Sequence, residues 1–241
     1  DSRIKILHTE PSVGLQFNTG LKAAKGEYIG ICESDDYILP NMYEVQYKMA
    51  KQNKLDILKA NFNRFCGYGK ESIILPFNVL GDDSLYGQIL CPRDNDNMLK
   101  MGIISYWSGI YRKDFLLEHD IFMNETKGAA YQDTSFAFIA LLQAERVMIL
   151  KDAFYCYRWD NPKSSVNAPQ KVTTLIEEYA ALKKRLVKDN MFELCKEYYF
   201  SWKVGGLVWF YSRLPQSQKM EYVHLLYAEL YQDLNSGEFQ G

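Results

Sequence analysis

The sequence lacks several features that would place it in a class at once. No apolar run reaches the roughly 18 residues of a membrane span, and no charged and then apolar leader opens the chain. The five cysteines are an odd number, and the shortest spacing, Cys66 to Cys91, is 25 positions. This pattern argues against a disulfide framework and a paired-cysteine metal site, and a cytoplasmic location is expected.

An excess of charge of one sign is also missing. Lys and Arg number 28 against 30 Asp and Glu, a formal net charge of −2, so no global electrostatic attraction to nucleic acid exists and no such partner is expected. Hydrophobic residues make up 47% and charged residues 24%, which excludes a disordered chain and allows a sizeable core. The length of 241 residues fits one large domain, or a domain with a substantial appendage.

Strand and helix patterns alternate in the first two thirds of the chain. They predict an α/β fold with a mostly parallel sheet flanked by helices. Ser12 is placed to N-cap the first helix, Gly26 is expected to cap its C-terminus, and Pro40 opens the second helix. The expected strands are 4–7, 27–32, 55–62, 106–112, 147–150 and 154–158, and the expected helices are 13–24, 41–52, 113–119 and 133–144.

The character of the chain changes to helix after Pro169. Three helical segments are expected there, at 170–188, 192–211 and 216–234. We therefore predict a boundary near residue 168, with an α/β domain over 1–168 and a helical appendage over 169–241.

Three carboxylates lie where the strand 27–32 ends, namely Glu33, Asp35 and Asp36. Ligands bind outside the carboxyl ends of strands in sheets of this kind. Carboxylates this close repel each other unless a cation is present, and hard oxygen ligands suit Mg²⁺ or Mn²⁺ with a bound diphosphate. The alternative is a solvated turn in which these side chains bond local backbone or cap the next helix.

A further carboxylate, Asp133, opens the helix that is expected to run to Ala144. The helix dipole favours its ionised form there, and an ionised carboxylate can act as a general base. Simple capping of the helix is the alternative.

Two blocks of sequence resemble family 2 glycosyltransferases of the GT-A fold, the bacterial type that builds surface polysaccharides. The first block runs from Asn18 to Ile29 (NTGLKAAKGEYI) and continues with Glu33-Ser34-Asp35-Asp36 and Pro40. The second comprises Trp107, Tyr111-Arg112, Gln132-Asp133-Thr134-Ser135-Phe136, Tyr155-Cys156-Tyr157-Arg158 and Ser164-Ser165. The resemblance covers residues 3 to 168 and leaves out the helical tail.

The resemblance implies a metal-dependent, inverting transfer from a nucleotide-sugar donor to a glycan or lipid-linked acceptor. Asp35 would be the ligand of Mn²⁺ or Mg²⁺, and Asp133 would be the base that deprotonates the acceptor. The donor would be bound by Asn18, Glu33, Asp36 and Arg158.

Two of the implied roles have structural alternatives. Arg158 either places a cation near the diphosphate or forms an ion pair with Asp152 or Asp160. Trp107 either presents its ring to a sugar or packs in the core.

The chain departs from the family pattern in three places. Glu33 stands where the family usually has Asp, and Phe17 stands where it often has Arg. The family's first strand and its acidic base-gripping residues would precede Asp1. A non-catalytic module that binds a glycan or a subunit is therefore the alternative function.

The aromatic segment 198–211 leaves three interpretations open. Packing on the catalytic domain is favoured, and the others are a homodimer and peripheral contact at the inner face of the plasma membrane. The segment lacks the Lys/Arg-rich face of interfacial helices.

Overall fold

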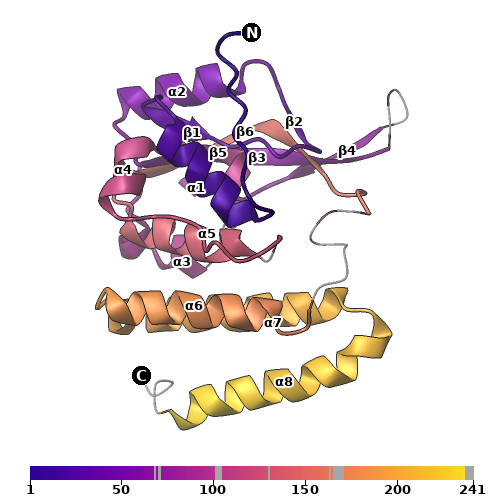
Figure 1. Cartoon of the computed structure of the whole chain (residues 1–241). Coiled ribbons are helices and arrows are strands. Elements are labelled where there is room, and N and C mark those ends of the chain that lie inside the picture. The colour runs from indigo at the N-terminus through magenta and orange to yellow at the C-terminus, as the bar shows by residue number, and fades with distance from the viewer. Residues whose placement is uncertain are drawn as a thin grey trace.

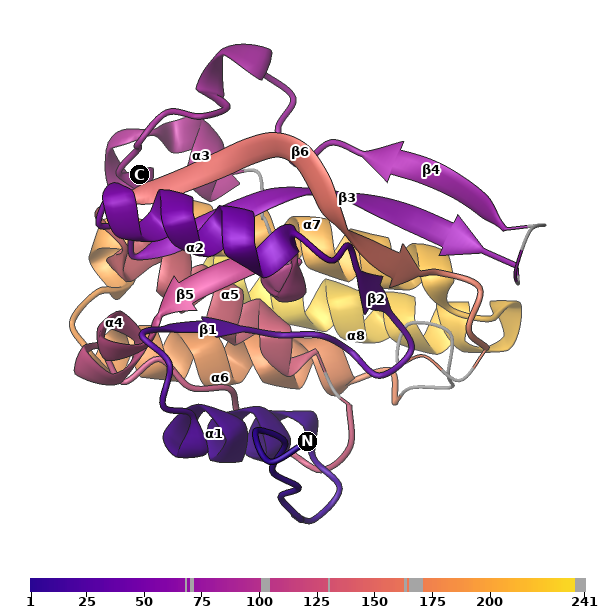
Figure 2. The same cartoon turned by 90° about the horizontal axis from the view of Figure 1, so that it is seen from above.

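The computed structural model describes residues 1–67, 69, 72–100, 105–129, 131–162, 164 and 171–236. One six-stranded sheet forms its centre, in the order β1 (Tyr28–Gly30), β5 (Gly109–Arg112), β3 (Ile57–Cys66), β6 (Val147–Arg158) and β2 (Tyr37–Ile38). Strand β4 (Ile73–Phe77) pairs with β3 off this path. Figure 2 shows the sheet from above, with the chain crossing from β1 to β2 beside the end of β6.

The sheet is mixed, so the expectation of a mostly parallel sheet is wrong. Among the described strands only β3 and β6 pair in parallel, and the other four pairs are antiparallel. The reason is β5, which enters between β1 and β3 and runs against both, with Tyr111 opposite Ile29 and Ile57. The two strands expected at 147–150 and 154–158 are one strand, β6, whose register against β3 shifts at Asn61.

Helices cover both faces of the sheet (Figure 1). Helix α2 (Met42–Gln52) lies on one face, and α5 (Gln132–Gln143) lies on the other beside α1 (Val13–Ala23) and α3 (Asp96–Lys100). The short helix α4 (Lys113–Glu118) follows β5 directly. The hydroxyl of Ser12 accepts a 3.1 Å hydrogen bond from the N–H of Leu15, which confirms the predicted N-cap.

Two local predictions near the N-terminus are wrong. Residues 4–7 form no strand, because no described strand lies alongside to pair with them, and Ile4 and Ile6 are 72% and 78% exposed. The C-cap of α1 is Ala24 rather than Gly26. Its backbone is extended, and its N–H donates to the carbonyl of Gly20.

Three helices follow the α/β part as expected. Helices α6 (Thr174–Lys188) and α7 (Phe192–Arg213) pack beneath α5, and α8 (Gln216–Asn235) lies outermost (Figure 1). The α/β class with a helical appendage is thus confirmed.

One continuous group of buried side chains extends from the sheet into α6 and α7. The indole N–H of Trp202 on α7 donates to the carbonyl of Leu99 at the end of α3, which fastens the appendage further. The packing interpretation of 198–211 is confirmed for its inward face. The boundary near residue 168 lies outside the described residues, and the division into two domains stays a prediction. Among the described helices none combines the length and apolarity that a membrane crossing needs.

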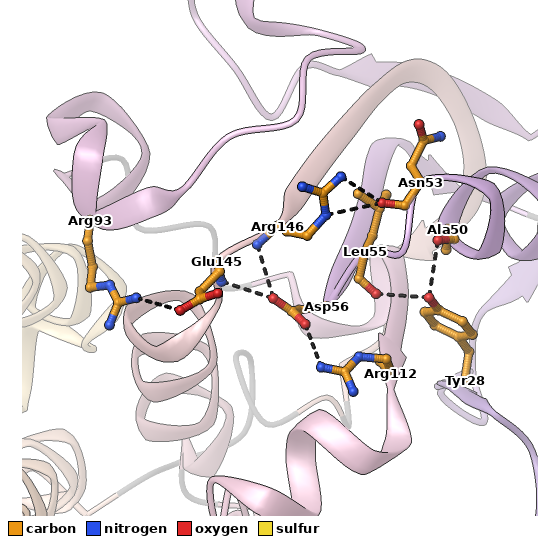
Figure 3. A network of polar contacts seen from close by, with 9 residues as sticks. All are labelled: Tyr28, Ala50, Asn53, Leu55, Asp56, Arg93, Arg112, Glu145 and Arg146. Atoms are coloured by element: carbon orange, nitrogen blue, oxygen red, sulfur yellow. Dashed lines mark hydrogen bonds and ion pairs between the residues drawn. The ribbon is translucent and has the colours of Figure 1, made fainter.

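The carboxylate of Asp56 fastens the beginning of β3 to its neighbours (Figure 3). Its Oδ1 accepts a 2.8 Å bond from Arg112, and its Oδ2 accepts bonds of 2.9 and 3.0 Å from the backbone N–H groups of Glu145 and Arg146. Asp56 is 7% exposed. Because β3 and β6 run in parallel, this network lies at the end of the sheet opposite Arg158.

Replacement of Asp56 with alanine is expected to lower the free energy of unfolding by about 2 kcal/mol, because two backbone N–H groups and Arg112 lose their acceptor. Urea denaturation measures this loss. The matched control is Asp83→Ala, which removes an exposed ion pair with Lys151 and should cost under about 0.5 kcal/mol. Equal costs for the two variants would contradict this role of Asp56.

Candidate functional site

The acidic cluster lies in the loop between β1 and β2, and β6 holds it in place. The hydroxyl of Tyr155 donates a 2.7 Å hydrogen bond to Asp36 Oδ2 and accepts one of 3.0 Å from the N–H of Glu33. The N–H of Arg158 donates to Asp36 Oδ1 at 2.7 Å. The cluster therefore sits at the carboxyl end of β6, where strand polarity predicts a ligand site.

The carboxyl of Asp36 is a structural member of this loop. Burial raises the pKa of Asp36 to about 6, helped by repulsion from Asp35 and Glu33 and opposed by the bonds from Arg158 and Tyr155. Both of its oxygens bond to β6 rather than to local backbone. The alternative of a solvated turn, in which these side chains bond local backbone, therefore describes Asp36 only in part.

Asp35 occupies the same loop and is partly exposed. Its Oδ2 accepts a 2.7 Å hydrogen bond from the amide of Asn161. Within the described residues, no group of three or more His, Cys, Asp or Glu side chains is arranged so that it could hold a metal ion. The donor set still fits Mg²⁺ or Mn²⁺, because such an ion is usually held by one or two carboxylates and by substrate phosphates.

Glu33 points toward the second acidic position. Its carboxylate accepts a hydrogen bond from the hydroxyl of Tyr106, which lies in the short helix η4 (Tyr106–Ser108) before β5. Burial raises the pKa of Tyr106, and the negative charges of Glu33 and Asp133 add to this effect. Tyr106 therefore lies within the electrostatic reach of both acids, which are 100 positions apart in the chain.

Asp133 is the second residue of α5 and is partly exposed. The N-cap residue is Tyr131, yet the Asp133 carboxylate accepts hydrogen bonds from the backbone N–H groups of Asp133 and Thr134 on the first turn, so the capping interpretation describes it in part. Withdrawal from water raises the pKa of Asp133 to about 7, with further contributions from the negative charges of Glu178 and Glu33. A carboxylate with this pKa can accept a proton near neutral pH.

The structural alternatives hold for Arg158 and Trp107. Arg158 Nε pairs with Asp160 Oδ1 at 3.0 Å. Trp107 is 9% exposed and stacks on Tyr155 and Tyr157, with ring centroids 4.4 and 5.1 Å apart. The Trp107 ring therefore supports the tyrosine that holds the acidic loop.

Asn18 fastens α1 to the segment 123–125. Its amide nitrogen donates to the carbonyl of Met123 at 2.9 Å and to Glu125 at 3.0 Å, and its oxygen accepts from the N–H of Met123 at 3.0 Å. One turn earlier, a Cβ on Gly14 would lie 1.9 Å from the carbonyl oxygen of Asn124, so only glycine permits this approach. Asn18 is 3% exposed, and its contact with a donor stays a prediction.

Sequence reasoning assigned no role to four members of the site. Tyr106 and Tyr155 hold the acidic loop, and Lys59 and Glu178 are charged neighbours of Asp133. A lysine inside the apolar strand pattern 55–62 is the signal that marks Lys59. Glu178 has no comparable signal, because acids are common in helices. Ser164 is described and Ser165 lies outside the described residues.

Comparison with known proteins identifies the family. Residues 1–106 match the model of glycosyl transferase family 2. The chain is 31% identical over 185 residues to the uncharacterized glycosyltransferase EpsJ of Bacillus subtilis. The aligned region covers 71% of this chain and 49% of EpsJ. It is 22% identical over 172 residues to WfgD of Escherichia coli, named as a UDP-Glc:alpha-D-GlcNAc-diphosphoundecaprenol beta-1,3-glucosyltransferase, covering 70% of this chain and 60% of WfgD.

A solved structure agrees on the fold. TarS 1–349 of Staphylococcus aureus, crystallised with UDP-GlcNAc, superposes with a TM-score of 0.65 at 18% identity, and the match covers 94% of this chain and 63% of the TarS 1–349 chain. The expected GT-A-like fold is thereby confirmed. The chain spans about half the length of EpsJ. From these matches, the chain belongs to glycosyl transferase family 2.

Proposed function

We propose that the chain carries the acceptor side and part of the donor side of an inverting glycosyltransferase that uses a nucleotide-sugar donor. The observation that carries the proposal is the meeting of the two acidic positions, since Tyr106 binds Glu33 and lies in the electrostatic reach of Asp133. Two separated acids at one site match the two tasks of such a reaction, which are binding of the donor diphosphate and activation of the acceptor.

Asp133 is assigned the role of general base. The acceptor hydroxyl attacks the anomeric carbon from the face opposite the leaving group, and the bond from that carbon to the diphosphate oxygen breaks. The hydroxyl proton passes to Asp133, and the nucleoside diphosphate leaves with the bonding electron pair. The pKa of about 7 leaves a substantial ionised fraction of Asp133 near neutral pH.

Asp35 is assigned the metal, Mn²⁺ or Mg²⁺. Tyr155 and the Arg158 backbone bond the Asp36 carboxylate, and Tyr106 bonds the Glu33 carboxylate, whereas Asp35 accepts from the amide of Asn161. Such an ion neutralises negative charge on the diphosphate. Glu33 and Asp36 shape the donor side of the loop. Arg158 is a weaker candidate for the diphosphate, since Asp160 engages its guanidinium.

The donor and acceptor classes are proposed by analogy. TarS was crystallised with UDP-GlcNAc, and the name of WfgD specifies a UDP-sugar and a diphosphoundecaprenol-linked acceptor. We therefore favour a UDP-sugar and a glycan or lipid-linked acceptor of surface polysaccharide synthesis. The cytoplasmic location, membrane contact and homodimer stay predictions.

Calorimetric titration with a panel of nucleoside diphosphates, with Mn²⁺ and with EDTA, tests the donor half of the proposal. The titration is done on this chain and, if its native reading frame encodes a longer product, on that product as well. One diphosphate is expected to bind only with Mn²⁺. Absence of metal-dependent binding by both forms would contradict the proposed function and favour a non-catalytic module.

A further inference from the structure

Lys59 is a buried amine at the centre of the sheet. It is 2% exposed, and its Nζ donates to the carbonyl of Ser105 at 2.7 Å and lies 3.3 Å from the hydroxyl of Tyr111. That hydroxyl donates to the carbonyl of Tyr106 at 2.9 Å, and Tyr106 in turn binds Glu33. Polar contacts therefore run from the buried amine to the acidic loop.

Lys59 is linked through Tyr111 to helix α5, on which Asp133 lies. The ring of Phe136, one turn after Asp133 on α5, meets the ring of Tyr111 with centroids 5.2 Å apart. Burial lowers the pKa of Lys59 to about 7, and the charge of Asp133 opposes this shift. The two groups therefore interact although their distance along the chain is large.

Glu178 approaches Asp133 from the opposite direction, on helix α6 of the appendage. It is 3% exposed, and its Oε1 accepts hydrogen bonds of 2.6 Å from Ser135 and 2.9 Å from Asn124. Burial raises the pKa of Glu178, and these two bonds oppose the shift. Because Ser135 is two residues after Asp133, this contact fixes a carboxyl of α6 beside the first turn of α5.

Helix α7 braces the same turn of α5. Tyr131, two residues before Asp133, has a left-handed backbone with φ of 60°, which is uncommon for a residue with a Cβ. Its ring makes edge contacts with Trp209 and Phe210, with centroids 6.0 and 5.7 Å apart. The appendage thus contacts the chain on both sides of Asp133.

We infer that Lys59 and Glu178 are positioning residues that set the charge of Asp133 with opposite sign, and that the helical appendage is therefore part of the site. A positive charge on Lys59 favours the carboxylate of Asp133, and a negative charge on Glu178 disfavours it. The relevance to catalysis rests on the proposed function, because only there does Asp133 act as the base.

The remaining titratable groups near Asp133 do not cancel this effect. Among the described residues they are Glu33 from the acidic loop and the four tyrosines Tyr106, Tyr111, Tyr131 and Tyr179. Burial raises the pKa of each tyrosine, so all four are neutral at pH 7. Glu33 acts in the same direction as Glu178 and is common to every variant below.

A carboxyl ¹³C titration tests the inference without any substrate. Protein with ¹³C-labelled Asp carboxyls is titrated by NMR, and the Asp133 signal is identified by its loss in Asp133→Asn. Lys59→Met is expected to raise the Asp133 midpoint, and Glu178→Gln to lower it, each by about one pH unit. The amide introduced by Glu178→Gln keeps an acceptor oxygen for Ser135 and Asn124, so this variant is expected to fold.

Lys203→Met is the matched control. Lys203 is equally buried, at 1% exposure, and pairs with Glu229 and Asp233 on α8 at 2.6 and 2.5 Å. Its loss should leave the Asp133 midpoint unchanged. If Lys59→Met does not fold, Lys59→Gln replaces it, since an amide can still donate to the Ser105 carbonyl.

Shifts of the same sign, or no shift in either variant, would overturn the inference. Opposite shifts in a protein that turns over no donor would support the electrostatic placement and contradict the proposed function instead. A wild type that turns over donor, together with variants whose Asp133 midpoint is unshifted, would support the proposed function. The same result would contradict the role of Lys59 and Glu178. The two failures are therefore distinguishable.

Discussion

Asp133→Asn is expected to lower the rate of sugar transfer by a factor of about 100 to 10,000, the usual contribution of a general base. The amide keeps the shape of the side chain and cannot accept the acceptor proton. Asp133 lies on the first turn of α5, so the substitution leaves the acidic loop between β1 and β2 intact. Donor affinity is therefore expected to stay unchanged while turnover falls.

The pH profile of the wild type is part of the same prediction. Because the pKa of Asp133 is raised to about 7, the base is protonated below this pH, and the transfer rate should fall as the pH drops through 7. Asp114→Asn is the matched control, since Asp114 also lies on a first helical turn, in α4, and is exposed. Turnover of Asp133→Asn equal to that of Asp114→Asn would remove Asp133 as the base.

Asp35→Ala is expected to abolish the effect of Mn²⁺ on donor binding, a loss on the order of 100-fold in affinity when the metal is present. The reason is that Asp35 is bonded by the amide of Asn161, which lies beyond β6, whereas both oxygens of Asp36 bond to β6 and the Glu33 carboxylate accepts from Tyr106. Titration of the donor diphosphate with Mn²⁺ and with EDTA measures the effect. The variant should bind with the EDTA-like affinity under both conditions.

Ser34→Ala is the control for the acidic loop, because Ser34 is exposed and is a direct neighbour of Asp35. Its metal response should equal that of the wild type. A preserved metal response in Asp35→Ala would show that another group holds the ion. Both variants are expected to fold, because the bonds between Asp36, Tyr155 and Arg158 are untouched. Thermal unfolding checks this.

The sequence predicts most helices and the end of the sheet where the acids lie, because these depend on local signals. Ser12, Pro40 and the helical spacing of apolar residues are such signals, and the helices they predict are present within a few residues. The expectation that Glu33 and Asp133 belong to one site comes from the family resemblance. The spacing of the two residues in the sequence does not predict it.

The sequence could not predict which strands and side chains far apart in the chain pair with each other. The direction of β5 depends on its two neighbours, and the segment 4–7 has strand-like residues but no described partner strand. Asn18 has the residue type of a ligand contact, yet its amide bonds the backbone of Met123, 105 positions away. Glu178 enters the site only because α6 packs on α5.

The most direct test of the account is release of nucleoside diphosphate from a panel of nucleotide sugars with Mn²⁺, by the wild type and by Asp133→Asn. It is done on this chain and, if its reading frame encodes a longer product, on that product as well. The wild type is expected to release nucleoside diphosphate from one donor class. An acceptor should stimulate this release, and Asp133→Asn should nearly abolish it. No release from any donor by either form would contradict the account and leave a binding module of the glycosyltransferase family.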